Sequence, residues 1–376
     1  MRVVPRDVGR VAQVRLRGRV ESPLASGQAL GRCVDWLCRS HDATDRNGSS
    51  KGYSLLHGWL PAYPETTGYV LGTLLDYCDH TSADPELVKR SREMGDWEVR
   101  VQESDGGIME GHVETQPRRS IVFNTGMVLH GWVDLIERGW VEYMDSAELA
   151  GNFLLENLRA DGTWHPEYEY SGLPHTYNSR VSWAMVRWGQ HSGQDSVVEA
   201  AKRQLDWVCG QQRSNGWFDS CRFKSGTAPS THAIAYTIRG LLESYALLGE
   251  QAWLDAAVRA SDPLLGKLEE LPLLVANYDS DWSPAAKYAC LTGTVQLGGV
   301  WLRLHTLTAE ERFLAAGLKA VEQGAAFQQT GGSGDIRGAL PGSFPIWGRY
   351  APLQYPNWAT KFLADSLMLY ERAVAG

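Results

Sequence analysis

The chain has 376 residues, of which 43% are hydrophobic and 21% charged, and 44 acidic against 36 basic residues give it a formal net charge of −8. This composition excludes intrinsic disorder, and the negative charge argues against a nucleic-acid-binding protein, which needs a basic surface for phosphates. The 15 Trp and 15 Tyr residues indicate a large aromatic-lined core or cleft. The length suggests two domains, although repeat folds of this size often form one.

The N-terminal residues carry charges throughout positions 1–20 and lack the apolar stretch of a signal peptide. No apolar run reaches the roughly 18 residues that a membrane-spanning helix needs. We therefore expect residues 1–25 to be an N-terminal extension and the protein to be cytoplasmic, without a transmembrane segment.

Two kinds of helical segment alternate along the rest of the chain. The first is an amphipathic helix that runs into a Gly-rich turn, often with a Gln just before the turn. Its instances cover residues 35–54, 99–111, 154–168, 206–220 and 325–338. The turn signal recurs at Gly106, Gly162 and Gly216, so its spacing is 56 and then 54 residues.

The second kind of segment follows each turn and is rich in small and apolar residues on nearly all sides, which is typical of a buried helix. Its instances cover residues 66–79, 122–139, 175–193, 231–250, 288–307 and 357–374. The alternation of outer segments with six inner segments predicts an all-α fold, an (α/α)6 toroid of six helical hairpins over residues 26–376. One pair cannot bury its apolar face alone, whereas six pairs closed into a ring can.

One face of this ring is expected to carry the functional residues. The long loops that join outer to inner helices share one face, and short strands are compatible with the fold only in these loops. The positive ends of the inner-helix dipoles point to the same face and favour bound anions. We therefore expect functional residues at the starts of the inner helices and in the loops before them.

The first group of candidates lies in residues 58–70, where Tyr63, Glu65 and Thr66 come just before an apolar helix. A Pro-braced loop with a Thr cap and a Glu near the positive helix end would explain them structurally. The functional interpretation makes Tyr63 a catalytic acid or base and Glu65 a base or a sugar-binding carboxylate.

The second group is the densest in ionisable and hydrogen-bonding side chains. It comprises His165, Glu167, Tyr168, Glu169, Tyr170, His175, Tyr177, Asn178 and Arg180. We expect His175, Tyr177 and Arg180 to be catalytic. We expect Glu167, Glu169 and Asn178 to bind substrate, while the structural alternative is a solvated loop with a histidine cap.

The remaining candidates are spread over the other inner-helix starts. Asn124 opens one of these helices, and His232 and Tyr236 lie about one turn apart on another. The segment 335–361 is long, aromatic and rich in Gly and Pro, as a substrate-covering loop would be. From these places we expect substrate-binding roles for Asn124, His232, Tyr236, Trp347, Tyr355 and Asn357.

We predict no obligatory catalytic metal and no cofactor, and binding of a cation without a catalytic role stays open. Glu110 and His112 are two residues apart with no third ligand in local reach, and the metal, phosphate-loop and dinucleotide motifs are absent. The six cysteines have no zinc-site spacing and lie mostly in helix-like apolar patterns, so we expect buried thiols.

This pattern resembles the α/α-toroid carbohydrate-active enzymes, which include unsaturated uronyl hydrolases, polysaccharide lyases, sugar 2-epimerases and glucuronyl C5-epimerases. The stretch from Tyr63 to Thr67 is similar to the Tyr-Pro-Thr-Thr stretch of glucuronyl C5-epimerases, with Ala62 where that family has an acid and Glu65 inserted. The resemblance implies an active-site role for Tyr63 alone. The turn at 212–217 also resembles terpene-cyclase repeats, but the aspartate-rich motifs of those cyclases are absent.

These observations favour an enzyme that uses general acid/base chemistry on an acidic, uronate-containing saccharide. Asn124, His175, Asn178 or Arg180 could mask the substrate carboxylate while a Tyr or His removes the neighbouring proton. Loss of a leaving group gives a lyase and reprotonation gives an epimerase, and the sequence does not separate the two.

Two alternatives stay open. A glycoside hydrolase would need two carboxyl groups roughly 5–10 Å apart, for which the candidates are Glu65, Asp105, Glu167, Glu169 and Asp335. A noncatalytic toroid that binds a glycan in a polysaccharide-assembly system would use the same aromatic residues for recognition. The oligomeric state is not indicated.

Overall fold

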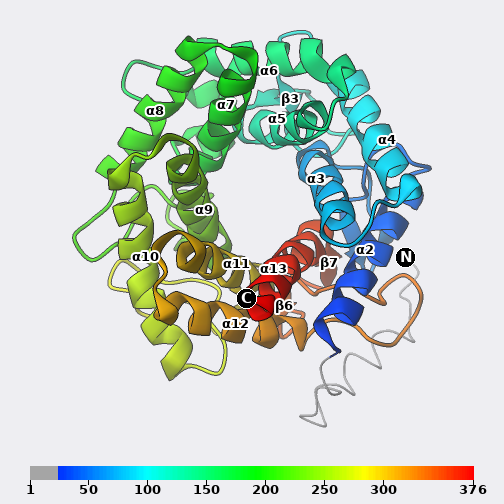
Figure 1. Ribbon diagram of the computed structural model, residues 1–376, viewed down its shortest axis with the longest axis vertical. Helices are drawn as coiled ribbons and strands as arrows, with labels where there is room; N and C mark the ends of the chain where they lie inside the picture. The colour runs from blue at the N-terminus through cyan, green and yellow to red at the C-terminus, as the bar shows by residue number, and fades with distance from the viewer. Residues whose placement is uncertain (1–23) are drawn as a thin grey trace.

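The computed structural model describes residues 24–376, which form a ring of twelve α-helices in two concentric layers (Figure 1). The outer helices are α2 (Ser26–Asp42), α4 (Pro85–Val101), α6 (Met144–Glu156), α8 (Asp195–Gly210), α10 (Gln251–Glu270) and α12 (Glu311–Ala325). The inner helices are α3 (Pro64–His80), α5 (Val122–Glu137), α7 (Ser179–Ser192), α9 (Thr231–Leu248), α11 (Leu291–Thr308) and α13 (Asn357–Ala375). The predicted (α/α)6 toroid is confirmed. The predicted N-terminal extension, residues 1–25, lies outside the described residues except for its last two.

The helices pack as hairpins, and one hairpin joins the two ends of the ring. Each inner helix packs against the outer helix that follows it through a short connection, as α3 does against α4 and α7 against α8. The sixth pair is α13 with α2, which lie side by side in Figure 1. Ser26 Oγ donates a 2.7 Å hydrogen bond to Glu371 Oε1 across this closure, and Trp36 Nε1 donates one of 2.7 Å to the Asp335 carbonyl.

The two layers differ in burial as their sequences predict. In α12 the buried residues Phe313, Gly317, Ala320, Val321 and Gly324 follow one stripe. In α5 only two of the sixteen residues, Asp134 and Glu137, are not buried. Inner helices also approach one another closely, because a Cβ added at Gly68 of α3 would lie 2.5 Å from Val128 Cα of α5.

The long connections from outer to inner helices carry the strands and 3-10 turns. Strands β1 (Gly52–Ser54), β2 (Gly58–Trp59) and β7 (Gln354–Pro356) form an antiparallel sheet in the order β2-β1-β7. Strand β3 (Ile108–Met109) pairs with β4 (Ser120–Ile121), and β5 (Ala289–Cys290) with β6 (Ser343–Phe344). The 3-10 turns are η1 (Val141–Tyr143), η2 (Pro166–Tyr168), η3 (Tyr170–Gly172) and η4 (Thr176–Asn178).

The repeated Gln and Gly residues have a structural role, because they hold each turn against the next outer helix. Gln102 Nε2 donates to the Gly106 carbonyl in its own turn and to the Ser146 carbonyl of the next outer helix, at 2.9 and 3.0 Å. Gln212 and Gln328 make the same pair of bonds in their turns. Gly106 has a positive φ of 85°, and a Cβ there would collide with the Leu149 carbonyl oxygen. The signal therefore fixes the spacing of neighbouring outer helices.

None of the helices in the described part of the chain is long and apolar enough to cross a membrane.

Candidate active site

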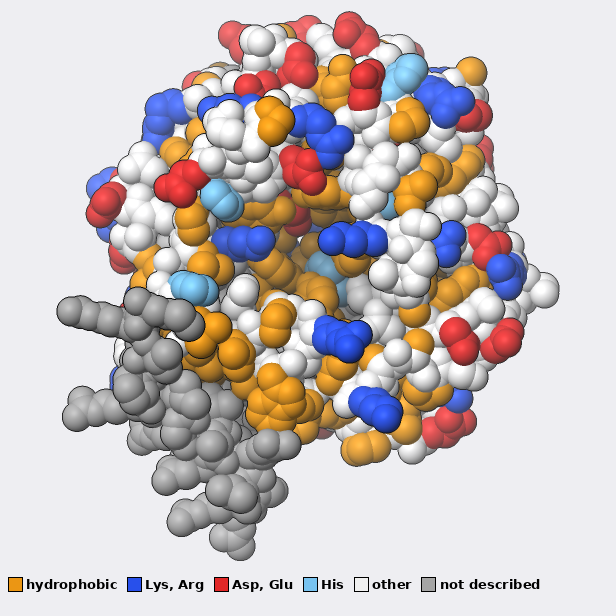
Figure 2. Space-filling model, turned by 180° about the vertical axis from the view of Figure 1, so that it is seen from behind, with side chains coloured by type: hydrophobic (Ala, Val, Ile, Leu, Met, Phe, Trp, Pro, Cys, Tyr) orange, Lys and Arg blue, Asp and Glu red, His pale blue; other side chains and the backbone are white. Residues whose placement is uncertain are grey.

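The centre of the ring is hollowed on the face shown in Figure 2, where hydrophobic side chains lie within the hollow and Lys and Arg side chains surround it. Along the axis, aromatic rings from the first turns of the inner helices and from the long loops touch one another. Phe123 contacts Tyr177 and Tyr236, both with ring centroids 5.3 Å apart, and Tyr236 contacts His232 at 4.2 Å. One cluster of aromatic rings therefore lies at the inner-helix starts.

A hydrogen-bonded network of Tyr63, Glu65, Asn124 and Tyr170 lies at this end of the ring. Tyr63 precedes α3 and its hydroxyl donates to Glu65 Oε2 at 2.7 Å. The Tyr170 hydroxyl, from η3, donates to Asn124 Oδ1 at 2.7 Å and lies 3.4 Å from the Tyr63 hydroxyl. Asn124 is fixed in turn because its Nδ2 donates to the Met109 carbonyl. The long loop before α7 thus completes a site begun by α3 and α5.

The electrostatics of Glu65 make it a stronger base than an exposed carboxylate. Burial raises its pKa, although the hydrogen bond from Tyr63 and the positive charges of Lys51 and Arg180 act in the opposite direction. The same burial, together with the charge of Glu65, raises the pKa values of Tyr63 and Tyr170 well above 10, so both phenols are neutral donors at neutral pH. Glu65 and Tyr170 remain partly accessible.

Glu169 and Asn178 form a second buried unit. Asn178 Nδ2 donates to both carboxyl oxygens of Glu169 at 2.9 Å, and Glu169 is only 2% exposed. Burial raises the pKa of Glu169 to about 8, so it is protonated at neutral pH. This unit lies behind the accessible network rather than in it.

His175 supports the loop that carries Tyr170. Its Nε2 is 2.8 Å from the Tyr170 carbonyl, and its ring stacks on Tyr177 at 4.5 Å. Both side chains are at most 1% exposed, and burial lowers the pKa of His175, so it is neutral. The structure therefore places these two predicted catalytic residues beneath Tyr170.

His232, Tyr236 and Arg180 lie deeper along the axis. His232 Nδ1 is 2.6 Å from Gln296 Oε1, and burial lowers the pKa of His232 to about 3. The Arg180 guanidinium lies over the Tyr236 ring with Cζ 4.9 Å from its centroid. Arg180 lines a cavity farther along the axis that Tyr63, Glu65 and Tyr170 do not line.

The other predicted substrate-binding residues are not brought into the network. Asn357 is fully buried and pins the start of α13, because its Nδ2 donates to Ser49, Ser50 and Thr66. Tyr355 is fully buried in β7, whereas Glu167 is exposed on η2 and Trp347 is 42% exposed.

Three residues to which the sequence analysis gave no site role join the site. Lys51 Nζ lies 5.0 Å from the centroid of the Tyr63 ring. The Trp358 ring is 6.5 Å from that ring, and Trp358 Nε1 donates to the Tyr350 hydroxyl at 2.8 Å. Trp358 and Tyr350 belong to the aromatic segment predicted to cover substrate. Lys51 carries no local signal, since β1 and its pairing with β7 bring it there.

The described residues contain no group of three or more His, Cys, Asp or Glu side chains placed to hold a metal ion. Glu110 pairs with Arg119, and His112 Nδ1 accepts from the Glu114 amide at 3.3 Å. Independence from metals and cofactors stays a prediction.

No family model matches this chain, and no curated protein matches it in sequence. Solved structures do match its fold over nearly its whole length. An unsaturated glucuronyl hydrolase specific for heparin has a TM-score of 0.73 at 12% identity, covering 93% of this chain and 98% of that one. The unsaturated glucuronyl hydrolase of Bacillus sp. GL1 has a TM-score of 0.73 at 15% identity, covering 94% and 98%. A sugar epimerase from a ruminal bacterium has a TM-score of 0.68 at 12% identity, covering 90% and 98%. At these identities the likeness establishes the toroid fold.

Proposed function

We propose that the protein is a carbohydrate-active enzyme that removes the proton beside the carboxylate of a uronate-containing saccharide. The network of Tyr63, Glu65 and Tyr170 carries the proposal, because it joins a carboxylate of raised pKa to two hydroxyls at a partly accessible end of the ring. The fold neighbours named for glucuronyl groups and for sugar epimerisation support this substrate class.

Glu65 and Tyr63 act together as the base. The hydrogen on the carbon beside the carboxylate passes to the Tyr63 oxygen while the Tyr63 hydroxyl proton passes to Glu65 Oε2, 2.7 Å away. The carbon–hydrogen bond breaks and its electrons move toward the substrate carboxylate. Glu65 ends protonated, and no free phenolate is needed.

Lys51 is the cation that receives the substrate carboxylate. Its ammonium group lies over the Tyr63 ring, within 5.0 Å of the centroid, and no ion pair of Lys51 is present among residues 24–376. A charge here stabilises the enolate-like intermediate at the place where negative charge develops. The aromatic rings of Trp358 and Tyr350 beside it suit the apolar face of a sugar.

The placement of Tyr170 favours elimination over epimerisation. The hydroxyls of Tyr63 and Tyr170 are 3.4 Å apart and therefore face the same side of a bound sugar ring. Epimerisation needs a proton donor on the opposite side. An elimination in which hydrogen and leaving oxygen share one face, as they do at C5 and C4 of D-glucuronate, needs both groups on one side. Tyr170 then protonates the leaving oxygen and takes up the proton held by Glu65, whose Oε2 lies 3.5 Å from the Tyr170 hydroxyl.

The test follows the C5 proton by NMR in D2O with 4-linked glucuronate oligosaccharides and, for comparison, 4-linked galacturonate oligosaccharides. We expect cleavage of the glucuronate chain with an unsaturated product. Y63F should abolish it, whereas Y143F should not, since Tyr143 makes a matched 2.8 Å bond to Asp96 away from the site.

Three other outcomes overturn parts of the proposal. Exchange at C5 without cleavage would establish an epimerase in place of a lyase. Cleavage with the C5 proton retained would favour a hydrolase that uses Glu65 and the protonated Glu169. Binding without any reaction would favour a noncatalytic glycan-binding toroid.

A further inference from the structure

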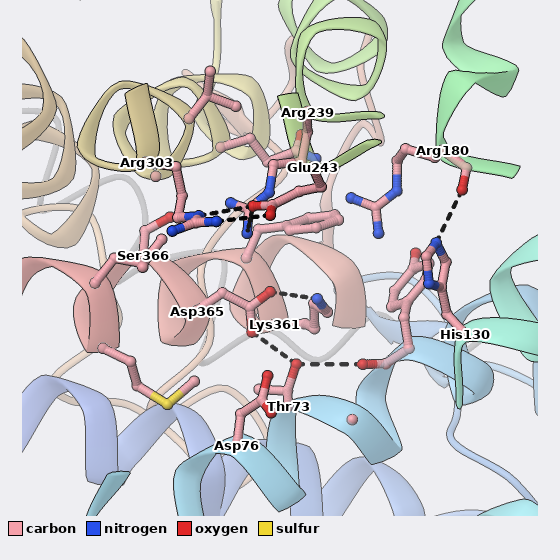
Figure 3. Close-up of a pocket in the computed structure, with 18 of the residues that line it drawn as sticks. Thr73, Asp76, His130, Arg180, Arg239, Glu243, Arg303, Lys361, Asp365 and Ser366 are labelled. Atoms are coloured by element: carbon pink, nitrogen blue, oxygen red, sulfur yellow. Dashed lines mark hydrogen bonds and ion pairs between the residues drawn. The ribbon is translucent and has the colours of Figure 1, made fainter. Parts of the chain in front are cut away.

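A cavity of about 500 Å³ occupies the axis among the middle and later turns of the inner helices (Figure 3). All six inner helices contribute to its wall, and the aromatic residues Tyr69, Trp183 and Phe362 are among the lining side chains. The proposed catalytic residues Tyr63, Glu65 and Tyr170 do not line it. The cavity is large enough for a monosaccharide-sized ligand.

One wall of this cavity has an excess of positive charge. Glu243 of α9 accepts from two arginines, with Arg239 Nη2 2.7 Å from Oε1 and Arg303 Nε and Nη2 each at 2.9 Å. Two guanidinium groups thus share one carboxylate. Arg180 of α7 adds a third positive charge to this wall, and Figure 3 shows its guanidinium extending toward the cavity.

The buried guanidinium of Arg180 is the strongest indication that this cavity binds an anion. It is 5% exposed, its Nε has no hydrogen-bond partner, and no carboxylate pairs with it among residues 24–376. Its neighbours are the faces of Trp183, Tyr236 and Phe362, at 4.9 to 5.6 Å from Cζ. Glu65 and Asp365 act on Arg180 only at longer range. A buried charge without a direct ion pair destabilises the fold, so an anionic ligand that pairs with Arg180 explains its retention.

The opposite wall supplies groups for a hydroxylated ligand. Asp365 of α13 pairs with Lys361 and accepts from Thr73 Oγ1 at 2.8 Å. Asp76 and Ser366 lie beside them in Figure 3. A ligand anion at Arg180 would therefore have hydrogen-bonding partners for its hydroxyls across the cavity.

We propose that this cavity is a second binding site, separate from the catalytic network, for a carboxylated or phosphorylated monosaccharide whose anionic group pairs with Arg180. Arg239 and Arg303 strengthen the local positive potential, and Trp183 and Phe362 contact the sugar ring. The proposal does not depend on which reaction the protein catalyses.

The test is calorimetric titration with D-glucuronate, D-glucose 6-phosphate, D-glucose and inorganic phosphate as probes. We expect the two sugar anions to bind with 1:1 stoichiometry, and the stronger of the two identifies the anionic group. R180M should weaken that binding by at least about 30-fold, as removal of one partner from a buried charge pair does. Y63F should retain the binding, and R213M, which removes an exposed arginine paired with Asp219, is the matched control.

Thermal unfolding provides a second measurement. Without ligand, R180M should unfold at a temperature equal to or higher than the natural chain, because an unpaired buried charge is gone, and sugar anions should no longer raise that temperature. Undiminished binding by folded R180M, or its loss in Y63F, would overturn the proposal. Equal binding of inorganic phosphate and both sugar anions would reduce the site to a simple anion site, and no binding of any probe would refute it.

Discussion

The Tyr63 hydroxyl donates to Glu65 Oε2 at 2.7 Å although only Pro64 separates the two residues. Tyr63 has an extended backbone and Glu65 is in the first turn of α3, so the change of direction at Pro64 turns both side chains to one side. Glu65 also lies near the positive end of the helix dipole. A short local motif thus creates a coupled donor and acceptor.

This coupling predicts the effect of E65Q. Glutamine keeps the size of the side chain but cannot accept the proton from Tyr63, so the rate of C5 proton removal, measured as formation of the unsaturated product, should fall by about 10²- to 10⁴-fold, the usual contribution of general base catalysis. In the natural chain the rate should rise with pH through a pKa above the ordinary 4.5 of glutamate, because the carboxylate is the active form and burial raises its pKa. Initial rates against pH measure both effects. The exposed E142Q is the control, and an unaltered profile in E65Q would remove Glu65 as base.

The close approach of inner helices predicts opposite effects for two Gly-to-Ala changes. G68A places a Cβ 2.5 Å from Val128 Cα and should lower the free energy of unfolding by about 1–3 kcal/mol, since backbone cannot move aside cheaply. G31A lies within α2 with nothing within 4 Å of the new Cβ and should raise it by about 0.5–1 kcal/mol. Denaturant unfolding compares the two. Equal effects would contradict the inner-helix contact.

The buried carboxyl group of Glu98 in α4 should make the stability of the fold depend on pH. Its carboxyl oxygens are buried without hydrogen-bond partners in the described chain, and burial raises its pKa well above 4.5. The folded state therefore keeps a proton that the unfolded state releases, so this group destabilises the fold increasingly as pH rises above 4.5. E98L should raise the unfolding temperature by about 2–4 °C at pH 8 and by less at pH 5. The exposed E148L should show no such trend, and a pH-independent difference in E98L would contradict the assignment.

We predict that the six cysteines react with a thiol reagent in two stages. All six are free thiols, with Cys33, Cys78, Cys221 and Cys290 buried and Cys38 and Cys209 half-buried. Burial raises the pKa of Cys38 to about 11 and that of Cys209 to about 12, so both should react slowly at pH 8, and before the other four. Mass spectrometry should count six labels after unfolding without reductant. Fewer than six would reveal a disulfide.

The sequence predicted the ring because its repeats are local. Burial stripes and Gly-rich turns depend on residues within one helix and its loop, and the Gln clamp recurs after α4, α8 and α12. Tyr63, Glu65 and Asn124 could be chosen for the same reason, since each stands at a helix start.

The rest of the site depends on contacts that local patterns do not encode. Tyr170, rather than Tyr177, reaches the network because Ser171 has a positive φ of 57° and turns the loop there. Lys51 is positioned by pairing of β1 with β7, some 300 residues away in sequence. Arg180 begins α7 as predicted, but its long side chain extends along the axis into the other cavity.

The pairing of α13 with α2 has a consequence for the order in which the protein is made. Five hairpins can form as soon as their two helices have left the ribosome, but α2 precedes the other helices of the ring and its principal partner α13 follows them. One apolar helix face therefore stays uncovered until α13 is made, together with the open edge of α3. Such surfaces on a nascent chain bind chaperones or associate with one another. The ring closes only when the nineteen residues of α13 are available to pack against α2.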